Sequence, residues 1–262
     1  MKKIGLALGA GGARGFCHIG VIEVLLENKI PINVVTGCSM GAMVGGGLVS
    51  GVSVDKMREI ACEITNFKVF DLDLFGIKRR GGFAKGNRAM KIYAKHVEDK
   101  NIEDCDIKFA ATATDLMSHQ LYTFTSGSLL GAIRASIAIP GVFHPVTCDD
   151  KLFVDGGVLE RIPIQAARDL GADIVIAIDA LGPPRRQNPK SALGVVDLSY
   201  QVMDWKTAQS EIKKADILIT PDMGTRSSFR FRDNQDTIQA GRDAAIKMLP
   251  EIWAKLVDTK SV

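Results

Sequence analysis

The stretch INVVTGCSMGAMV, residues 32–44, decides the fold of this chain. Its first half is rich in β-branched and apolar residues and predicts a buried strand, and its second half opens a run of small residues that predicts a helix. Between the two, Gly37 and Gly41 permit a tight turn around Ser39. A strand, a sharp turn with a central serine and a helix together make a nucleophile elbow, which lifts a serine hydroxyl to a strand end.

The same five residues have a simpler interpretation. A glycine-rich chain produces such a motif by chance, and the turn then only packs a helix of small residues on a sheet. Cys38 is a rival nucleophile, but it lies on the strand side of the turn. We therefore expect Cys38 to behave as a small buried apolar residue.

Apolar segments alternate with segments of helical spacing along the rest of the chain. The predicted strands are Lys3–Leu8, Ile32–Thr36, Phe109–Asp115, Leu152–Val154, Ile174–Asp179 and Ala215–Pro221. The predicted helices are Phe16–Asn28, Met40–Ser50, Asp55–Thr65, Pro163–Leu170 and Asn234–Val257, the last one broken near Pro250. This alternation predicts an α/β protein with a mostly parallel sheet covered by helices on both faces, in one domain over residues 1–262.

Composition narrows the class of protein. Twelve of the 26 glycines fall between Gly5 and Gly51, so we expect backbone there that approaches another group closely. A net charge of +3 is too small to indicate nucleic-acid binding. The five cysteines form no CxxC pair, so the sequence predicts no metal site, no cofactor, and reduced thiols in a cytoplasmic protein.

Two segments imitate membrane signals. The N-terminus pairs two lysines with an apolar run, but glycines and Arg14 interrupt it, and we predict a first strand instead of a signal peptide. Residues 30–54 carry no charge, but Pro31 and six glycines make them a poor membrane span. A strand, a turn and a helix explain that segment better.

A second glycine-rich turn, GAGGARG at residues 9–15, follows the first predicted strand. Consecutive glycines expose backbone N–H groups, which suits stabilisation of an oxyanion. A dinucleotide-binding loop is the rival interpretation. The sixth residue of this turn is Arg14, where the dinucleotide-binding pattern has glycine. No acidic residue ends the second predicted strand either, so the dinucleotide-binding pattern is incomplete.

A serine nucleophile also needs a base. None of the four histidines (His18, His96, His119 and His144) lies in a late loop, where an α/β-hydrolase places its base. Asp155, in the tripeptide Asp155-Gly156-Gly157 after a short predicted strand, is the better candidate. The tripeptide is also an ordinary turn sequence, so taken alone it does not identify a base.

These blocks together resemble the patatin-like phospholipase family, in particular its short bacterial members. The carriers of the resemblance are the glycine loop with His18-Ile19-Gly20, the GCSMG turn, residues 135–145 (ASIAIPGVFHP) and Asp155-Gly156-Gly157, in that order along the chain. The match is good over about residues 3–180 and looser beyond. It implies a three-layer α/β/α sheet related to the α/β-hydrolase architecture.

The resemblance also implies a Ser–Asp dyad of Ser39 and Asp155, which are 116 residues apart. In the family the aspartate takes the hydroxyl proton, an acyl-enzyme forms on the serine, and water releases a fatty acid. Gly11 and Gly12 are then the oxyanion donors, with Gly9 and Gly15 shaping the loop. Arg14 belongs to the same oxyanion loop, where it steadies the loop or attracts an anionic substrate.

Two departures from the family pattern stand out. Glu160-Arg161 occupy positions where members often carry an asparagine, which leaves the hydrogen bonding around Asp155 open. Cys38 replaces a small hydroxyl residue before the serine, and we expect little effect from it.

The predicted activity is hydrolysis of carboxylic esters of phospholipids or lysophospholipids. The alternatives are a non-catalytic adaptor on the same fold and an acyltransferase. The apolar and basic segment Phe67–Arg88 suits either a lid at an anionic membrane or a flap over the core. Arg226, Arg230 and Arg232 alternate with Phe229 and Phe231 in a second such stretch, either a membrane or phosphate contact or a solvated turn. We expect a lipid or fatty-acyl ester substrate and a peripheral contact with the inner face of an anionic membrane, and the sequence predicts no oligomeric state.

Overall fold

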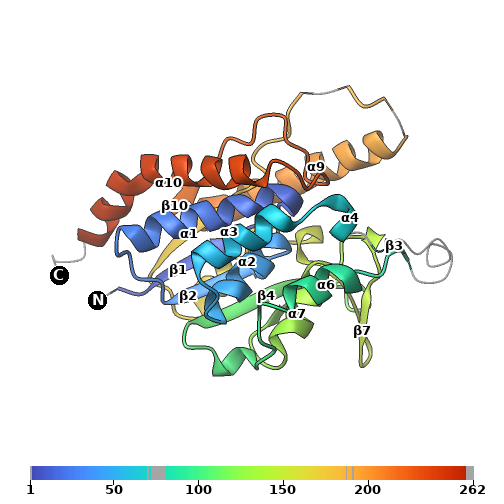
Figure 1. Ribbon diagram of the computed structural model, residues 1–262, viewed down its shortest axis with the longest axis horizontal. Helices are drawn as coiled ribbons and strands as arrows, with labels where there is room; N and C mark the ends of the chain where they lie inside the picture. Colours follow the sequence, from blue (N-terminus) through green and yellow to red (C-terminus); the bar gives the residue numbers. More distant parts are fainter. Residues whose placement is uncertain (1, 70, 72–80, 187, 191, 258–262) are drawn as a thin grey trace.

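A computed structural model describes residues 2–69, 71, 81–186, 188–190 and 192–257 (Figure 1). Its main sheet has eight strands in the order β10-β9-β1-β2-β4-β8-β7, with β5 paired to β4. The strands are β1 Ile4–Leu8, β2 Val34–Cys38, β4 Lys108–Asp115, β5 Gln120–Phe124, β7 Val146–Cys148, β8 Lys151–Asp155, β9 Ile174–Ile178 and β10 Ile217–Ile219. The run from β10 to β4 is parallel, and β5, β8 and β7 are antiparallel. A separate parallel pair joins β3 Gly82–Ala84 to β6 Gly141–Phe143.

Helices cover both faces of the sheet. One face carries α1 Cys17–Glu27, α2 Met40–Val49, α3 Val54–Glu63 and α10 Asn234–Val257, which lie together in Figure 1. The other face carries α8 Ile164–Asp169, with α9 Ala192–Glu211 joined to it through η4 Ile212–Lys214. Shorter elements are α4 Asn66–Val69, α6 Asn87–Tyr93, α7 Leu129–Ser136, η1 Gly12–Phe16, η2 Ile102–Asp104 and η3 Gly156–Val158. The larger apolar core fills the α1/α2/α10 side and a smaller one the α8 side, which confirms the predicted three-layer α/β class.

One predicted break is wrong. Helix α10 runs through Pro250 without interruption. Proline removes a single N–H from the helical ladder. Ile252, beyond it, is fully buried in the larger core, and burial of the helix face holds the last turns in place despite the lost hydrogen bond.

The segment Phe67–Arg88 was expected to form either a lid at a membrane or a flap over the core. Most of Phe67–Arg88, including residues 70 and 72–80, lies outside the described residues, so its role as lid or flap stays a prediction. Residues 182–190 are irregular where described and lead into α9, a helix that the sequence reasoning missed.

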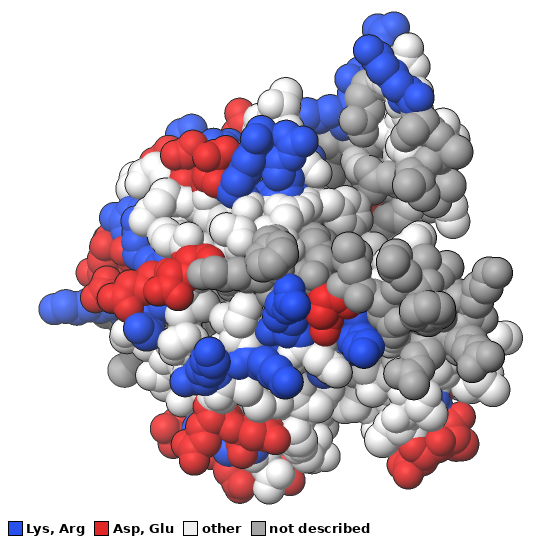
Figure 2. All heavy atoms as spheres, turned by 45° about the vertical axis from the view of Figure 1, so that its right-hand side comes forward, with Lys and Arg blue, Asp and Glu red and all other residues white. Residues whose placement is uncertain are grey.

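The structure also bears on the membrane and charge expectations. Within the described ranges, no helix combines the length and apolar character needed to cross a bilayer. On the face drawn in Figure 2, Lys and Arg side chains are interspersed with Asp and Glu, in keeping with the small net charge.

Candidate active site

Strand β4 brings the two candidate catalytic residues together. Cys38, the last residue of β2, pairs with Thr112, and Asp155, the last residue of β8, pairs with the next residue, Ala113. Strand β5 pairs with the opposite edge of β4. Strands β2 and β8 therefore pair with the same edge of β4, one after the other, and their last residues come together there. Ser39 directly follows Cys38, so the register places Ser39 beside Asp155.

Ser39 occupies a strained turn. Its φ of 55° and ψ of −122° lie outside the regions that residues with a side chain normally adopt. Its N–H donates to the Ser136 Oγ at 2.9 Å, and its side chain is buried, with 4% exposed. A Cβ at Gly41 would lie 2.0 Å from the Leu8 carbonyl oxygen, so only glycine allows α2 to begin this close to β1. Strain held by packing around one serine is typical of a functional site.

Asp155 is a buried carboxyl group, with 4% of the residue exposed. Its Oδ1 accepts a hydrogen bond from the Gly157 N–H at 2.9 Å, and the Cys38 Sγ lies 3.7 Å from the same oxygen. Burial raises the pKa of Asp155 from 3.8 to about 6, against the opposing effect of hydrogen bonds from Ser39, Gly157 and Cys38. Asp155 is therefore mostly ionised at neutral pH, yet a stronger base than an ordinary aspartate.

Cys38 shows the buried character expected of it. It is fully buried, and burial, followed by the charge of Asp155, raises the pKa of its thiol well above the usual value. A neutral thiol is a poor nucleophile.

The glycine loop is anchored at both ends. The Gly9 N–H donates to the Ile178 carbonyl at 3.0 Å, and the Gly9 carbonyl lies 2.8 Å from the His18 Nε2. Burial lowers the pKa of His18 to about 4, so the ring is neutral and serves as a brace for the loop. The Ala13 N–H donates to the Ser228 carbonyl at 2.8 Å. Gly9 thus ties the start of the loop to β9 and to α1.

Gly11 and Gly12 form the middle of this loop. No hydrogen bond from either N–H is found within the described part of the chain, and both glycines line the cavity that contains Ser39. Gly12 has a φ of +52°, and a Cβ there would lie 2.3 Å from the Ser228 oxygen. Two backbone donors without side chains therefore face the same space as the candidate nucleophile.

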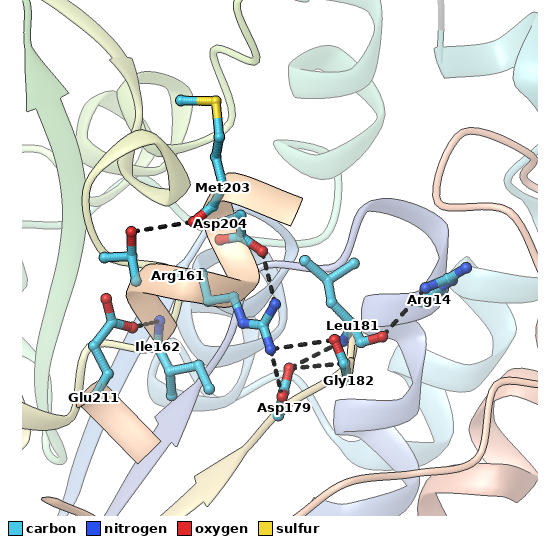
Figure 3. Close-up of polar contacts among 10 residues, drawn as sticks. Arg14, Arg161, Ile162, Asp179, Leu181, Gly182, Met203, Asp204 and Glu211 are labelled. Carbon is cyan, nitrogen blue, oxygen red and sulfur yellow. Dashed lines mark hydrogen bonds and ion pairs between the residues drawn. The ribbon is translucent and has the colours of Figure 1, made fainter. Parts of the chain in front are cut away.

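Arg14 contacts the backbone of two distant segments. Its Nε donates to the Arg226 carbonyl at 2.7 Å and its Nη1 to the Leu181 carbonyl at 3.3 Å, the second of which is drawn in Figure 3. Of the two roles considered for Arg14, these contacts match steadying of the loop.

Two cavities of different character meet at Ser39. The first, called here the apolar cleft, encloses about 600 Å³ of space, counting its opening to solvent. Its walls are Gly12, Ser39, Met40, Met43, Ile60, Ile64, Val69, Ala89, Ile92, Tyr93, Ile137, Ile139, Phe143 and Phe231. A further apolar pocket of about 440 Å³ shares five of these residues and continues the cleft toward α1 and α3.

The second cavity, called here the polar chamber, has a volume of about 560 Å³. Its walls are Ala10, Gly11, Gly12, Ser39, Ile139, Asp155, Gly157, Leu181, Tyr200, Gln201, Asp204, Ser228 and Phe229. Since Ser39 lines both cavities, a molecule with an apolar part and a polar part would place the junction between them at the serine hydroxyl.

Arg161 contacts Asp204, a residue of the polar chamber, and Asp179 at the end of β9 (Figure 3). It is 2% exposed, and its Nη1 contacts the Asp204 Oδ2 at 2.7 Å while its Nη2 contacts the Asp179 Oδ2 at 2.6 Å and the Gly182 carbonyl at 3.3 Å. Its guanidinium also lies 5.2 Å from the centre of the Trp205 ring. Arg161, one of the two residues that depart from the family pattern, thus fixes α9 against the end of β9. Asp155 keeps its hydrogen bond to the Gly157 N–H, within its own turn.

Sequence reasoning missed two side chains of this site. Ser136, which accepts the Ser39 N–H, belongs to the block of residues 135–145 and had no assigned role. Tyr200 lies on the missed helix α9, whose one available signal was the absence of glycine and proline from Val195 to Thr220. Among the described residues, no group of three or more His, Cys, Asp or Glu side chains is placed to hold a metal ion.

Fold and site together define a mixed α/β protein with a strained serine turn at the junction of an apolar and a polar cavity. The chain belongs to the patatin-like phospholipase family, whose sequence profile matches residues 6–168. The family expected from the sequence motifs is thereby confirmed.

Individual relatives agree with this assignment. An NTE family protein of Mycobacterium tuberculosis is 37% identical over 191 residues, which cover 71% of this chain and 52% of the relative. Lysophospholipase nte1 of Emericella nidulans is 31% identical over 182 residues, 68% of this chain and 12% of that protein. The chain thus spans about half the length of the mycobacterial relative, and far less of the fungal one.

Among solved structures, VipD from Legionella pneumophila is similar in fold, with a TM-score of 0.64 and 16% sequence identity. The likeness covers 96% of this chain and 67% of VipD. Relatives and family membership together support a lipid esterase at the level of the family.

Proposed function

We propose that this chain is a serine acyl hydrolase that cleaves carboxylic esters of phospholipids or lysophospholipids through Ser39 and Asp155. The observation that carries the proposal is the strained Ser39 turn, placed beside a buried carboxylate and at the mouth of an apolar cleft. The fungal relative named as a lysophospholipase supports the same substrate class.

In the proposed reaction, Asp155 takes the proton of the Ser39 hydroxyl while the Ser39 Oγ attacks the ester carbonyl carbon. The Gly11 and Gly12 N–H groups and the N-terminus of α2 stabilise the oxyanion. Collapse of the tetrahedral intermediate breaks the bond to the alcohol, which leaves with the proton from Asp155. Water then attacks the acyl-enzyme, and Asp155 takes the water proton and returns a proton to Ser39 as the fatty acid departs.

The two cavities hold different parts of the substrate. The fatty-acyl chain enters the apolar cleft, where Met40, Met43 and Tyr93 lead on to the second apolar pocket. The alcohol part occupies the polar chamber. Burial of an alkyl chain contributes about 0.8 kcal/mol per CH₂, so the cleft supplies binding energy that holds the ester at Ser39.

We further propose that the chain works in the cytoplasm and contacts an anionic membrane peripherally. Its five cysteines are scattered and form no CxxC pair, which suits a reducing compartment. Phe229, on the rim of the polar chamber, is 39% exposed and is followed by the exposed Arg230 and Arg232. An apolar side chain beside cations suits the headgroup region of an anionic bilayer.

The test is labelling with a fluorophosphonate together with a panel of acyl esters, comparing wild type with Ser39→Ala and Asp155→Asn. Ser50→Ala, at the opposite end of α2, is the matched control for loss of a serine hydroxyl. We expect wild type and Ser50→Ala to be labelled and to release fatty acid, and both site variants to release none.

Labelling that persists in Ser39→Ala would refute the proposal, as would a wild type inert toward every ester. The inert result would favour a non-catalytic adaptor. Acyl transfer to an added alcohol or carrier that outruns hydrolysis would instead identify an acyltransferase.

A further inference from the structure

Tyr200 is a polar side chain of the chamber that the proposed reaction does not use. It lines the polar chamber together with Ser39 and Asp155. Its hydroxyl and the Asp155 Oδ1 both lie within 3.4 Å of the position that a Cβ would take at Gly157. The phenol and the carboxyl group therefore border the same gap, which glycine at position 157 leaves unfilled.

Helix α9 is held so that Tyr200 keeps this position. Tyr200, Asp204 and Ala208 follow one another at four-residue spacing, so they share one face of the helix. Asp204 is buried in its contact with Arg161, and Ala208 is fully buried. A helix anchored one turn beyond Tyr200 by a buried ion pair presents that side chain to the chamber from a rigid support.

The chemistry of Tyr200 is that of a neutral hydrogen-bond donor. Although 39% of Tyr200 is exposed, loss of water from its chamber side, followed by the charge of Asp155, raises the pKa of its phenol, so the O–H keeps its proton. Within the described part of the chain no hydrogen bond of this hydroxyl is found, which leaves the donor available to a bound molecule.

The rest of the chamber indicates what that molecule carries. Its described walls contain two carboxyl groups, those of Asp155 and Asp204, together with an amide and several hydroxyl groups, but no Lys or Arg. The Asp204 carboxyl is paired with Arg161, so the hydroxyl and amide groups beside Asp155 are left to contact a bound molecule, and this lining suits a hydroxyl-bearing group next to the dyad.

We propose that Tyr200 donates a hydrogen bond to the oxygen of the leaving alcohol, and that the glycerol unit of this alcohol occupies the part of the polar chamber next to Asp155. This inference rests on the proposed function. As the ester bond breaks, negative charge develops on the alcohol oxygen, and a neutral donor across the gap from Asp155 stabilises it while Asp155 delivers its proton. Tyr200 itself loses no proton.

The experiment compares Tyr200→Phe with Tyr122→Phe. Tyr122, on β5, is also 39% exposed and packs against Phe124 at 4.7 Å between ring centres, so the two variants lose the same hydroxyl at matched exposure. Each is assayed with three palmitoyl esters: the monoacylglycerol, a lysophospholipid and the p-nitrophenyl ester. The measured quantity is kcat/KM, which reports formation of the acyl-enzyme.

We expect Tyr200→Phe to lower kcat/KM about tenfold for the two glycerol esters, the size of effect that one lost hydrogen bond produces. The p-nitrophenyl ester, whose leaving group needs no such donor, should react at the wild-type rate. Tyr122→Phe should match wild type on all three esters.

Equal losses on all three esters would overturn the assignment of Tyr200 to the leaving group, and so would a Tyr200→Phe variant as fast as Tyr122→Phe on the glycerol esters. Both outcomes leave the proposed function intact, because wild type still hydrolyses esters. If wild type hydrolyses no ester and Ser39 takes no fluorophosphonate label, the proposed function itself fails.

Discussion

Replacing Asp155 with asparagine should make the protein more stable above neutral pH while abolishing ester hydrolysis. The carboxyl group is buried, and burial raises its pKa from 3.8 to about 6. At 1.36 kcal/mol per pKa unit, this rise corresponds to about 3 kcal/mol that the ionised group costs the folded state. Asparagine is neutral at every pH and keeps an oxygen that accepts from the Gly157 N–H, so the variant avoids this cost.

The sign of the pH dependence follows from the proton balance. Between about pH 4 and pH 6 the folded wild type holds a proton on Asp155 that the unfolded chain has already released. The free energy of unfolding of wild type therefore falls through this window as pH rises, relative to the variant. The difference between Asp155→Asn and wild type should grow by up to about 3 kcal/mol and level off above about pH 7.

The assay is urea unfolding followed by circular dichroism at about pH 4, 5, 6, 7 and 8, for wild type and Asp155→Asn side by side. Asp149→Asn, at an exposed turn, controls for the loss of one negative charge. Because only the growth of the difference with pH is interpreted, any constant effect of the new side chain cancels. A difference that stays flat between pH 4 and pH 8, or that shrinks as pH rises, would refute the reasoning.

Three further outcomes are expected. The logarithm of kcat/KM for wild type should fall with unit slope below about pH 6, where the base Asp155 becomes protonated, and a profile flat down to about pH 4.5 would contradict this role. Gly12→Ala should lower kcat/KM at least about a hundredfold, because the φ of residue 12 is +52° and the new Cβ would lie 2.3 Å from the Ser228 oxygen. The rates are compared at the same folded fraction, with active serines counted by fluorophosphonate titration. Arg230→Ala should weaken binding to anionic lipid vesicles about fivefold relative to Lys247→Ala in a sedimentation assay, whereas equal binding by both would argue against the proposed membrane contact.

The local geometry of the elbow was open to sequence reasoning. Gly37 and Gly41 flank Ser39 within five residues, and whether a backbone can turn so sharply depends on residues adjacent in the chain. The expected strand ended at Thr36, whereas β2 continues to Cys38, a shift of two residues at an element end. The glycine loop at residues 9–15 was recognisable for the same local reason.

The residues alone made Asp155 a candidate base, and only the family resemblance paired it with Ser39 as a dyad. Nothing in the spacing of the two residues states that β8 runs antiparallel to β4 and meets β2 on the same edge. Strand order depends on contacts between residues far apart in sequence, which periodicity does not record.

The helix α9 and its ion pairs were out of reach for a related reason. The sequence suggested only that Glu160-Arg161 departs from the family pattern, and the meaning of Arg161 depends on Asp179 and Asp204, which lie 18 and 43 residues away. Likewise, the break expected at Pro250 follows from a local rule that burial of the α10 face overrides.

The sequence by itself therefore determined the turns, because glycine, serine and aspartate restrict their own backbone and that of their neighbours. It also determined the alternation of strands and helices that defines the class of fold. The tertiary structure alone decided which turns converge, how burial raises the pKa of Asp155, and that Tyr200 faces the same chamber as Ser39. Those properties arise from desolvation and from contacts across the sheet, which exist only once distant segments have packed together.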